Sequence, residues 1–168
     1  QARTIQTVTI TDCMLSLDEF IAVAKLGAKV EFSEEMKAAV RANRELLERF
    51  LKEGRIIYGV TTGFGENVRY TISPSDATTL QENIIRTHSV AVGEPLTRVQ
   101  ARAVMLMTIL NAGKGHSGIR IETLELIRQM LNLELIPYAP GEGSVGYLGV
   151  EAHLAMAYIG EGKIYEDG

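Results

Sequence analysis

The stretch Tyr58-Gly-Val-Thr-Thr-Gly-Phe-Gly65 combines one tyrosine with three glycines in eight residues. Glycine allows backbone conformations that other residues avoid and lets the chain approach a ligand closely. Such a loop is typical of a binding site, although taken alone it could equally be a plain turn. Three segments further along the chain favour the binding site: Gln81-Glu-Asn-Ile-Ile-Arg-Thr-His-Ser89, Gly115-His-Ser-Gly-Ile-Arg120 and Gly141-Glu-Gly-Ser-Val-Gly146.

In their order and separation, these four segments resemble the aromatic amino-acid ammonia-lyases and aminomutases, the family of histidine, phenylalanine and tyrosine ammonia-lyase. The resemblance covers nearly the whole chain: Leu15-Ser-Leu-Asp-Glu-Phe20 looks like the family's opening, and Ile159-Gly-Glu-Gly162 like the segment after its active centre. Enzymes of this family are much longer than 168 residues. The resemblance therefore implies that residues 1–168 are the N-terminal active-site domain, without the family's C-terminal helical bundle.

The composition is that of one ordinary globular domain, with 46% hydrophobic and 23% charged residues. A net charge of -4, with Lys and Arg scattered among acidic residues, argues against a nucleic-acid partner. The single cysteine, Cys13, cannot form an internal disulfide, and no signal-like or membrane-spanning apolar run is present. We expect a cytoplasmic protein with no membrane partner, and processing or truncation ahead of Gln1.

Local signals predict a mainly α-helical chain with a few short strands. Ser16 with Glu19, and Thr97 with Gln100, have the spacing of helix-capping boxes. The second box precedes residues 103–110, a run that is hydrophobic all round and therefore predicts a buried helix with its Met and Leu side chains in the core. The resemblance implies the N-terminal part of the helical ammonia-lyase fold, which is fumarase/aspartase-like.

Further helices are predicted from apolar spacing and from breakers such as Gly54. Alternating apolar and polar residues predict a strand at 5–10, and Lys163-Ile-Tyr165 is a candidate hairpin arm. Pro137 and Pro140 are expected to end regular structure. The predicted helices cover residues 16–27, 33–54, 75–87, 97–110 and 121–133.

In the family, a consecutive Ala-Ser-Gly triplet cyclises and loses water to give 4-methylidene-imidazol-5-one, an electrophile made from the backbone. The resemblance places this group between Gly146 and Tyr147, because His153 and residues 159–162 keep the family's register. No Ala-Ser-Gly occurs in the chain, which is short by three residues at this place. Under this alignment Tyr147 stands where the family has Asp, which is a departure from its pattern.

Two interpretations of the missing triplet compete. Either the three residues are absent from the protein, or the protein carries them as a cyclised group that the written sequence omits. The second is preferred, because every motif downstream of the gap stays in register. A third alignment, in which Tyr147-Leu-Gly149 replaces the triplet, needs three residues removed after it and is ranked lower.

The resemblance implies that Tyr58 is the catalytic base, which removes a proton from the β-carbon of the substrate. The phenolate needs positive charge or N–H groups directed at its oxygen, and the glycine amides of its own loop could supply them. Gly65 is accordingly assigned to the substrate-binding site. The alternative for Tyr58 is a tyrosine that simply lies on the surface of a turn.

The resemblance also implies that Thr87 and His88 read the substrate's side chain. A Phe-Leu pair at this point goes with phenylalanine, His-Leu with tyrosine, and Ser-His with histidine and with some tyrosine aminomutases. We therefore predict that the full-length protein converts L-histidine to urocanate, with tyrosine as runner-up, since an imidazole offers little to a bare phenyl ring. Tyrosine or phenylalanine ammonia-lyase and 2,3-aminomutase remain alternatives. Tyr58 and His88 are expected to line one pocket near Gly146.

The family assembles as a homotetramer in which the tyrosine loop and the prosthetic group come from different subunits, so the resemblance implies a homo-oligomer. We expect the isolated 168-residue chain to be inactive. If the triplet is truly absent, the chain could instead be a catalytically dead paralogue or a structural subunit.

Metal and nucleotide are not expected. His88, His116 and His153 lack the spacing of metal ligands and are not accompanied by a cysteine cluster, so His116 and His153 are interpreted as structural, the latter as a satisfied helix histidine. Residues 141–146 match the G-x-G-x-x-G dinucleotide pattern. Two prolines lie where that pattern requires a strand, however.

Overall fold

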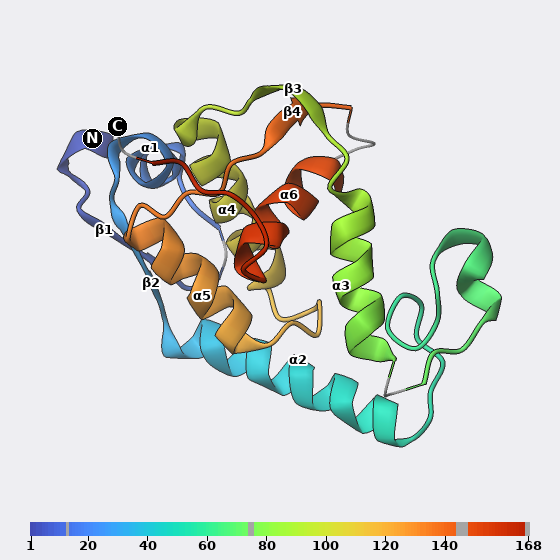
Figure 1. The fold of residues 1–168 in the computed structure, drawn as a ribbon. Helices are drawn as coiled ribbons and strands as arrows, with labels where there is room; N and C mark the ends of the chain where they lie inside the picture. Colours follow the sequence, from blue (N-terminus) through green and yellow to red (C-terminus); the bar gives the residue numbers. More distant parts are fainter. Residues whose placement is uncertain (13, 74–75, 144–147, 167–168) are drawn as a thin grey trace.

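The computed structural model describes residues 1–12, 14–73, 76–143 and 148–166 (Figure 1). Helices dominate this part of the chain, and the strands are short. The prediction of a mainly α-helical fold is confirmed. The elements are β1 (Thr7–Ile10), α1 (Leu17–Leu26), β2 (Lys29–Phe32), α2 (Glu34–Lys52), α3 (Ala77–His88), β3 (Val92–Pro95), α4 (Arg98–Ala112), α5 (Ile121–Asn132), β4 (Pro140–Glu142) and α6 (Leu148–Tyr158), with 3-10 turns at Ala2–Thr4 and Gly65–Arg69.

Both predicted capping boxes are present. The backbone N–H of Ser16 donates to the Glu19 carboxylate at 2.8 Å, and that of Thr97 donates to Gln100 Oε1 at 2.8 Å. Each box provides partners for N–H groups that a helix start otherwise leaves unpaired. α1 then ends at Gly27, whose φ of 77° is the left-handed conformation that favours glycine.

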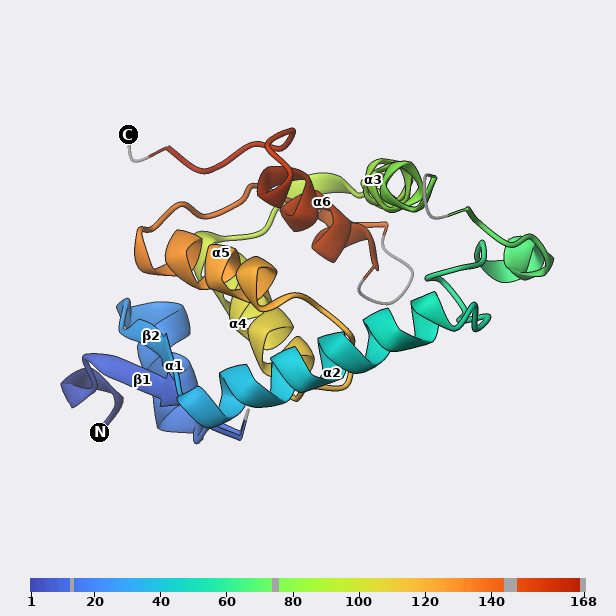
Figure 2. The same ribbon diagram turned by 90° about the horizontal axis from the view of Figure 1, so that it is seen from below.

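The helices pack in two groups. α4 lies between α1 and α5, and α2 runs along the outside of the molecule against α5 (Figures 1 and 2). α3 and α6 pack side by side on the opposite side of the body, and α6 also contacts α4. The last turn of α3, with His88, is thereby held against the helix that follows residue 147.

The predicted strand at 5–10 is observed as β1, which pairs in parallel with β2 in the register Val8 to Val30 and Ile10 to Phe32. These four side chains are buried, and their neighbours along each strand are exposed. β2 was not predicted, because a four-residue strand becomes stable only through its partner and through α5 packed against it.

The prediction that Pro140 ends regular structure was wrong. β4 begins at Pro140 and pairs antiparallel with β3, with Pro95 opposite Pro140. Both strands of this two-stranded sheet are edge strands. Proline is tolerated there, because its missing N–H can face away from the partner strand and so removes no hydrogen bond between the strands. The predicted hairpin arm at 163–165 is instead an isolated bridge of Ile164 to Pro137.

The predicted helix at 97–110 supplies the centre of the core. Met105, Leu106 and Ile109 on α4 are fully buried, together with Leu124 and Ile127 on α5. The prediction of a helix buried on every side was wrong at one position, because Met107 is 41% exposed. α4 packs against α1, α5 and α6, and Met107 lines a surface pocket together with Glu151 on α6.

The core also contains a charged residue, Arg102 on α4, which is only 5% exposed. Its guanidinium donates to the carbonyl of Val23 in α1 at 2.6 Å and to the carbonyl of Leu131 in α5 at 3.1 Å. It also donates to Glu134 Oε1 at 2.6 Å. One side chain thus links α1, α4 and the end of α5.

Candidate functional site

The segment between α2 and α3 projects beyond the helical body and carries the glycine-rich motif (Figures 1 and 2). The loop closes on itself: Thr62 pairs with Thr71 in an isolated bridge, and the Ile72 N–H donates to the Thr61 carbonyl at 2.8 Å. Its connection to the body includes a hydrogen bond from the Gln81 amide on α3 to the Gly59 carbonyl, at 3.2 Å. The loop is therefore ordered internally and attached at its base.

Tyr58 is 60% exposed, and its hydroxyl oxygen accepts a hydrogen bond from the backbone N–H of Gly65 at 3.2 Å. The Tyr58 ring lies edge-on to Phe64, with 5.6 Å between the ring centroids. Gly65 has a φ of 55°, the left-handed conformation that directs its N–H toward the tyrosine. The hydrogen bond from Gly65 thus fixes the position of the hydroxyl oxygen within the loop.

Gly63 is required for a different reason. A Cβ at this position would lie 2.8 Å from the backbone oxygen of Asn67. The loop therefore turns back on itself so tightly that only glycine fits. This turn brings Gly65 back to Tyr58.

His88 is the last residue of α3, and its Nδ1 lies 2.8 Å from the carbonyl oxygen of Ile84. The hydroxyl of Thr87 donates to the same oxygen at 3.2 Å. Because a carbonyl oxygen only accepts, Nδ1 carries the proton in this arrangement. The Nε2 atom of His88 is then the ring atom available to a ligand.

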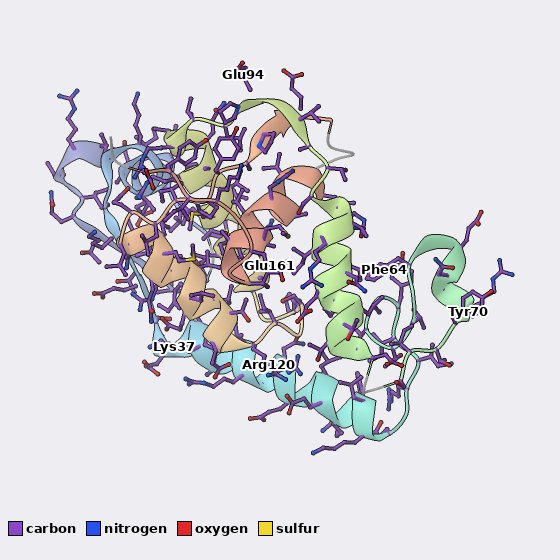
Figure 3. All side chains as sticks on the ribbon, viewed as in Figure 1. Lys37, Phe64, Tyr70, Glu94, Arg120 and Glu161 are labelled. Atoms are coloured by element: carbon purple, nitrogen blue, oxygen red, sulfur yellow. The ribbon has the colours of Figure 1, made fainter. Side chains whose placement is uncertain are left out.

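His88 lines a cavity of about 360 Å³ between α3 and α6, which we call the α3–α6 cavity. Its floor comes from α4 and α5, and Phe64 reaches it from the loop. Figure 3 shows Phe64 between the loop and α3. The lining residues are Phe64, Ile84, Ile85, His88, Thr108, Ile119, Thr123, Ile127, Leu148, Glu151, Ala152, Leu154, Ala155 and Tyr158.

Tyr58 lines a different cavity, of about 510 Å³, whose other walls include Phe50 on α2 and His116. The expectation that Tyr58 and His88 line one pocket is therefore not met within a single chain. Phe64 is the link between them, since it touches the Tyr58 ring and also lines the α3–α6 cavity. Gly146 and Tyr147, the expected flanks of the prosthetic group, lie outside the described residues.

An ion pair fixes α3 to the turn that follows α6. Arg86 donates to both carboxylate oxygens of Glu161, at 2.9 and 2.5 Å, and to Glu82 at 3.2 Å. Figure 3 shows Glu161 beside α3. These bonds, led by the hydrogen bond to Arg86, lower the pKa of Glu161. His88 is two residues after Arg86. The ion pair of Arg86 with Glu161 therefore also helps to position His88 relative to α6.

The comparison with protein families matches the model described as "Aromatic amino acid lyase" over residues 15–168. The chain belongs to this family. Over 157 residues it is 45% identical to "Histidine ammonia-lyase" of Streptococcus sanguinis (strain SK36), a match that covers 92% of this chain and 31% of the relative. The chain thus spans about a third of the length of the curated relatives it matches.

Solved structures of other aromatic amino acid lyases superpose on the chain. Tyrosine aminomutase from Streptomyces globisporus gives a TM-score of 0.92 at 34% identity, covering 96% of this chain and 31% of that chain. The ergothioneine degrading enzyme Ergothionase from Treponema denticola, in complex with desmethyl-ergothioneine sulfonic acid, gives a TM-score of 0.92 at 28% identity. This match covers 96% of this chain and 33% of that chain. The helical arrangement is therefore that of about a third of each of these proteins.

The three histidines of this chain lie in different surroundings. His116 is exposed and lines the cavity of Tyr58. His153 lies on α6, as predicted, but the prediction of a satisfied histidine was wrong, since its buried Nε2 has no hydrogen-bond partner among the described residues. Within that same part of the chain no cluster of His, Cys, Asp or Glu could hold a metal ion, and no helix could cross a membrane.

Sequence reasoning missed two polar residues of the α3–α6 cavity, Glu151 and Tyr158 on α6. The available signal was their separation of seven residues, which places both on one face of a helix. The family's motifs mark His153 on this helix but neither of these two residues.

Proposed function

We propose that the complete protein containing residues 1–168 is a carbon–nitrogen lyase that eliminates the α-amino nitrogen of an aromatic L-amino acid. L-histidine, giving urocanate, is the first candidate substrate. The observation that carries this choice is the Thr87-His88 pair, whose free Nε2 lines a cavity of about 360 Å³. A cavity of this size suits a small amino acid. The identity of 45% to a histidine ammonia-lyase supports the choice.

In this proposal Tyr58 acts as the base. It removes one proton from the β-carbon, and the electron pair of that C–H bond becomes the Cα–Cβ double bond as the Cα–N bond breaks. The N–H of Gly65, 3.2 Å from the hydroxyl oxygen, would hold that oxygen in place for this step. Tyr58 would act on a ligand held in the α3–α6 cavity of a neighbouring subunit, because one chain keeps the two apart.

The family implies a methylidene-imidazolone made from Ala-Ser-Gly, which would draw electrons from the substrate. The residues present do not fit this group, because Gly146 is followed directly by Tyr147 and the triplet occurs nowhere in the chain. Mass spectrometry of the proteolytic peptide that contains Gly146 and Tyr147 decides the matter. The peptide mass equals that of the written sequence if the group is absent, and exceeds it by three residues less two waters if the cyclised group is present.

A second candidate function follows from the missing triplet. An α-ammonium group is much more acidic than a β-C–H bond, so without an electrophile on the nitrogen a base removes the wrong proton. A quaternary nitrogen has no such proton, and it departs with the bonding electron pair as a neutral tertiary amine. The likeness to Ergothionase, with a TM-score of 0.92, supports a trimethylammonium derivative of histidine, such as ergothioneine, as this substrate.

The test is a side-by-side assay of the full-length protein with histidine, tyrosine, phenylalanine and ergothioneine, followed by the absorbance of the unsaturated acid. Turnover of histidine together with the larger mass supports the first function. Turnover of ergothioneine alone, with the Gly146–Tyr147 peptide at the mass of the written sequence, supports the second. A β-amino acid product identifies an aminomutase, and no turnover of any substrate indicates a structural protein.

The proposal includes a cytoplasmic homotetramer, as the family resemblance implies. Exposed apolar side chains, such as Ile56 and Leu148, are available for packing against other parts of the full-length protein or its copies. We expect the isolated 168-residue chain to give no turnover, because it spans about a third of its relatives. Light scattering of the full-length protein measures its subunit number.

A further inference from the structure

The α3–α6 cavity has one polar region in an otherwise apolar lining. Glu151 and Tyr158 both lie on α6, seven residues apart, so they are two helical turns apart on the same face. His88 lines the same cavity from α3. The remaining side chains of the lining are aliphatic, with the exceptions of Phe64, Thr108 and Thr123.

Glu151 is only weakly engaged by the protein. Its Oε1 accepts a long hydrogen bond, 3.5 Å, from the hydroxyl of Thr108. The described residues provide no further hydrogen-bond partner for this half-buried carboxylate. Burial raises the pKa of Glu151, and the bond from Thr108 opposes that shift. A carboxylate in such surroundings is strongly stabilised by a positively charged partner.

Tyr158 is also incompletely satisfied. Its hydroxyl oxygen is buried and has no hydrogen-bond partner among the described residues. Burial, followed by the nearby charge of Glu151, raises the pKa of Tyr158, so the hydroxyl stays protonated. A buried polar group without a partner is costly, and a ligand that donates an N–H to the Tyr158 hydroxyl oxygen removes part of that cost.

The chemistry of the lining favours a cation over an anion. None of the described residues that line the cavity is Lys or Arg. Arg86, which lies near on α3, is already paired with Glu161 and Glu82. The rings of Tyr158 and Phe64 offer faces that attract alkylammonium groups, and the carboxylate of Glu151 supplies the opposite charge.

We infer that Glu151 and Tyr158 form a binding site for the positively charged nitrogen of the substrate, opposite His88, which contacts the ring. The ligand class is a primary or quaternary ammonium on a small aromatic amino acid. The inference deepens the proposed function and rests on it for the identity of the ring. It assigns to Glu151 and Tyr158 substrate contacts that the sequence motifs did not indicate.

The test is calorimetric titration of the full-length protein with three probes. L-Histidine carries the ring, the carboxylate and the ammonium group, 3-(imidazol-4-yl)propanoate carries the ring and the carboxylate without the ammonium group, and tetramethylammonium carries the positive charge alone. Glu151→Gln, which keeps the shape and removes the charge, is expected to weaken binding of both cations by about tenfold or more. Tyr158→Phe is expected to weaken binding of L-histidine severalfold, because the hydroxyl is lost, and to change binding of tetramethylammonium little, because the ring is kept. Neither variant should change binding of the propanoate.

Glu45→Gln is the matched control, because Glu45 is an exposed carboxylate on α2. Its affinities should equal those of the wild type, and circular dichroism verifies that all variants fold. Cation binding that is unchanged in Glu151→Gln, or absent from the wild type, overturns the site. If histidine binds equally well to wild type and Glu151→Gln, the proposed function survives and the site fails. If tetramethylammonium binding depends on Glu151 but histidine does not bind, the cation site stands and the proposed substrate is wrong.

Discussion

The backbone N–H of Gly65 donates a hydrogen bond to the hydroxyl oxygen of Tyr58 at 3.2 Å. The residue predicted to act as a base is thus held by the glycine predicted to lie beside the substrate. The tyrosine is 60% exposed and contributes little to the core. Its role can therefore be tested without unfolding the protein.

Tyr58→Phe in the full-length protein is expected to reduce turnover by about a hundredfold to ten-thousandfold, the range that a positioned acid–base group contributes. The melting temperature should stay near that of the wild type, since the ring contact with Phe64 is retained. Turnover is measured by product absorbance and stability by differential scanning calorimetry. Wild-type activity in the variant would remove Tyr58 from the mechanism.

The glycines of the loop differ in what they tolerate. Gly65→Ala meets no atom within 4 Å but forces alanine into a φ of 55°, which costs about 1–2 kcal/mol. Gly63→Ala should be worse, because its Cβ would lie 2.8 Å from the Asn67 backbone oxygen. Gly54→Ala is the control, with a φ of 69° and open space outside the loop.

We expect Gly54→Ala to lower the free energy of unfolding about as much as Gly65→Ala does, and to leave turnover unchanged. Gly65→Ala and Gly63→Ala should both lower turnover, and limited proteolysis should cleave the loop of Gly63→Ala fastest. Equal turnover in all three variants would show that the loop's shape does not matter to the reaction.

His88→Phe should shift the substrate preference. Removing the imidazole loses a hydrogen bond to a polar ring, worth about 0.5–1.5 kcal/mol, or more if a polar group is left buried without a partner. The ratio of kcat/KM for histidine over phenylalanine is expected to fall. This ratio should fall less in His88→Gln, because glutamine keeps a hydrogen-bonding side chain. If phenylalanine is already the best substrate of the wild type, the interpretation of position 88 is wrong.

Glu161→Gln is expected to weaken the attachment of α3 to the turn after α6. The carboxylate has a lowered pKa in the folded protein, mainly through its hydrogen bond from Arg86. A lowered pKa stabilises the fold above the unfolded value of about 4.3, and that contribution is lost as the pH falls through the folded value. Wild type should therefore be slightly more stable than Glu161→Gln at pH 7 and indistinguishable from it in strong acid. Urea unfolding as a function of pH measures this, and a difference that grows on acidification would contradict it.

Arg102→Met should destabilise the protein by about 2–5 kcal/mol, because it leaves buried carbonyls without donors. The exposed control Arg41→Met on α2 should change the free energy of unfolding by less than about 0.5 kcal/mol. Urea unfolding monitored by circular dichroism compares the two. Equal stability of both variants would mean that Arg102 is replaceable by packing alone.

Local features of the fold were predictable and long-range ones were not. In the capping boxes, Ser16 and Thr97 form hydrogen bonds with residues three positions later. Both partners are therefore visible in one short stretch of sequence. β2 and β4 depend on pairing with other segments: β2 alternates polar and apolar residues over four residues only, and β4 begins at a proline. The buried position of Arg102 was not predicted, because its carbonyl partners belong to other helices.

The same distinction between local and long-range features holds for the candidate site. Tyr58 and Gly65 are close because seven residues separate them, whereas the separation of Tyr58 from the cavity of His88 depends on how the loop leaves the body. Glu151 and Tyr158 were missed because no motif requires them. Their importance appears only when α6 is packed against α3 and the cavity between the two helices is visible.

The buried guanidinium of Arg102 also constrains the order of folding. Its partners are the Val23 carbonyl in α1 and the Leu131 carbonyl in α5, elements separated by more than half of the sequence. If only α1 or only α5 packed against α4, the Arg102 guanidinium would lose its contact with water while half of its hydrogen bonds were still missing. A partly assembled core is therefore penalised, and α1, α4 and α5 should form late and together as one cooperative unit. Hydrogen exchange under native conditions should show the amides of these three helices opening with a common free energy.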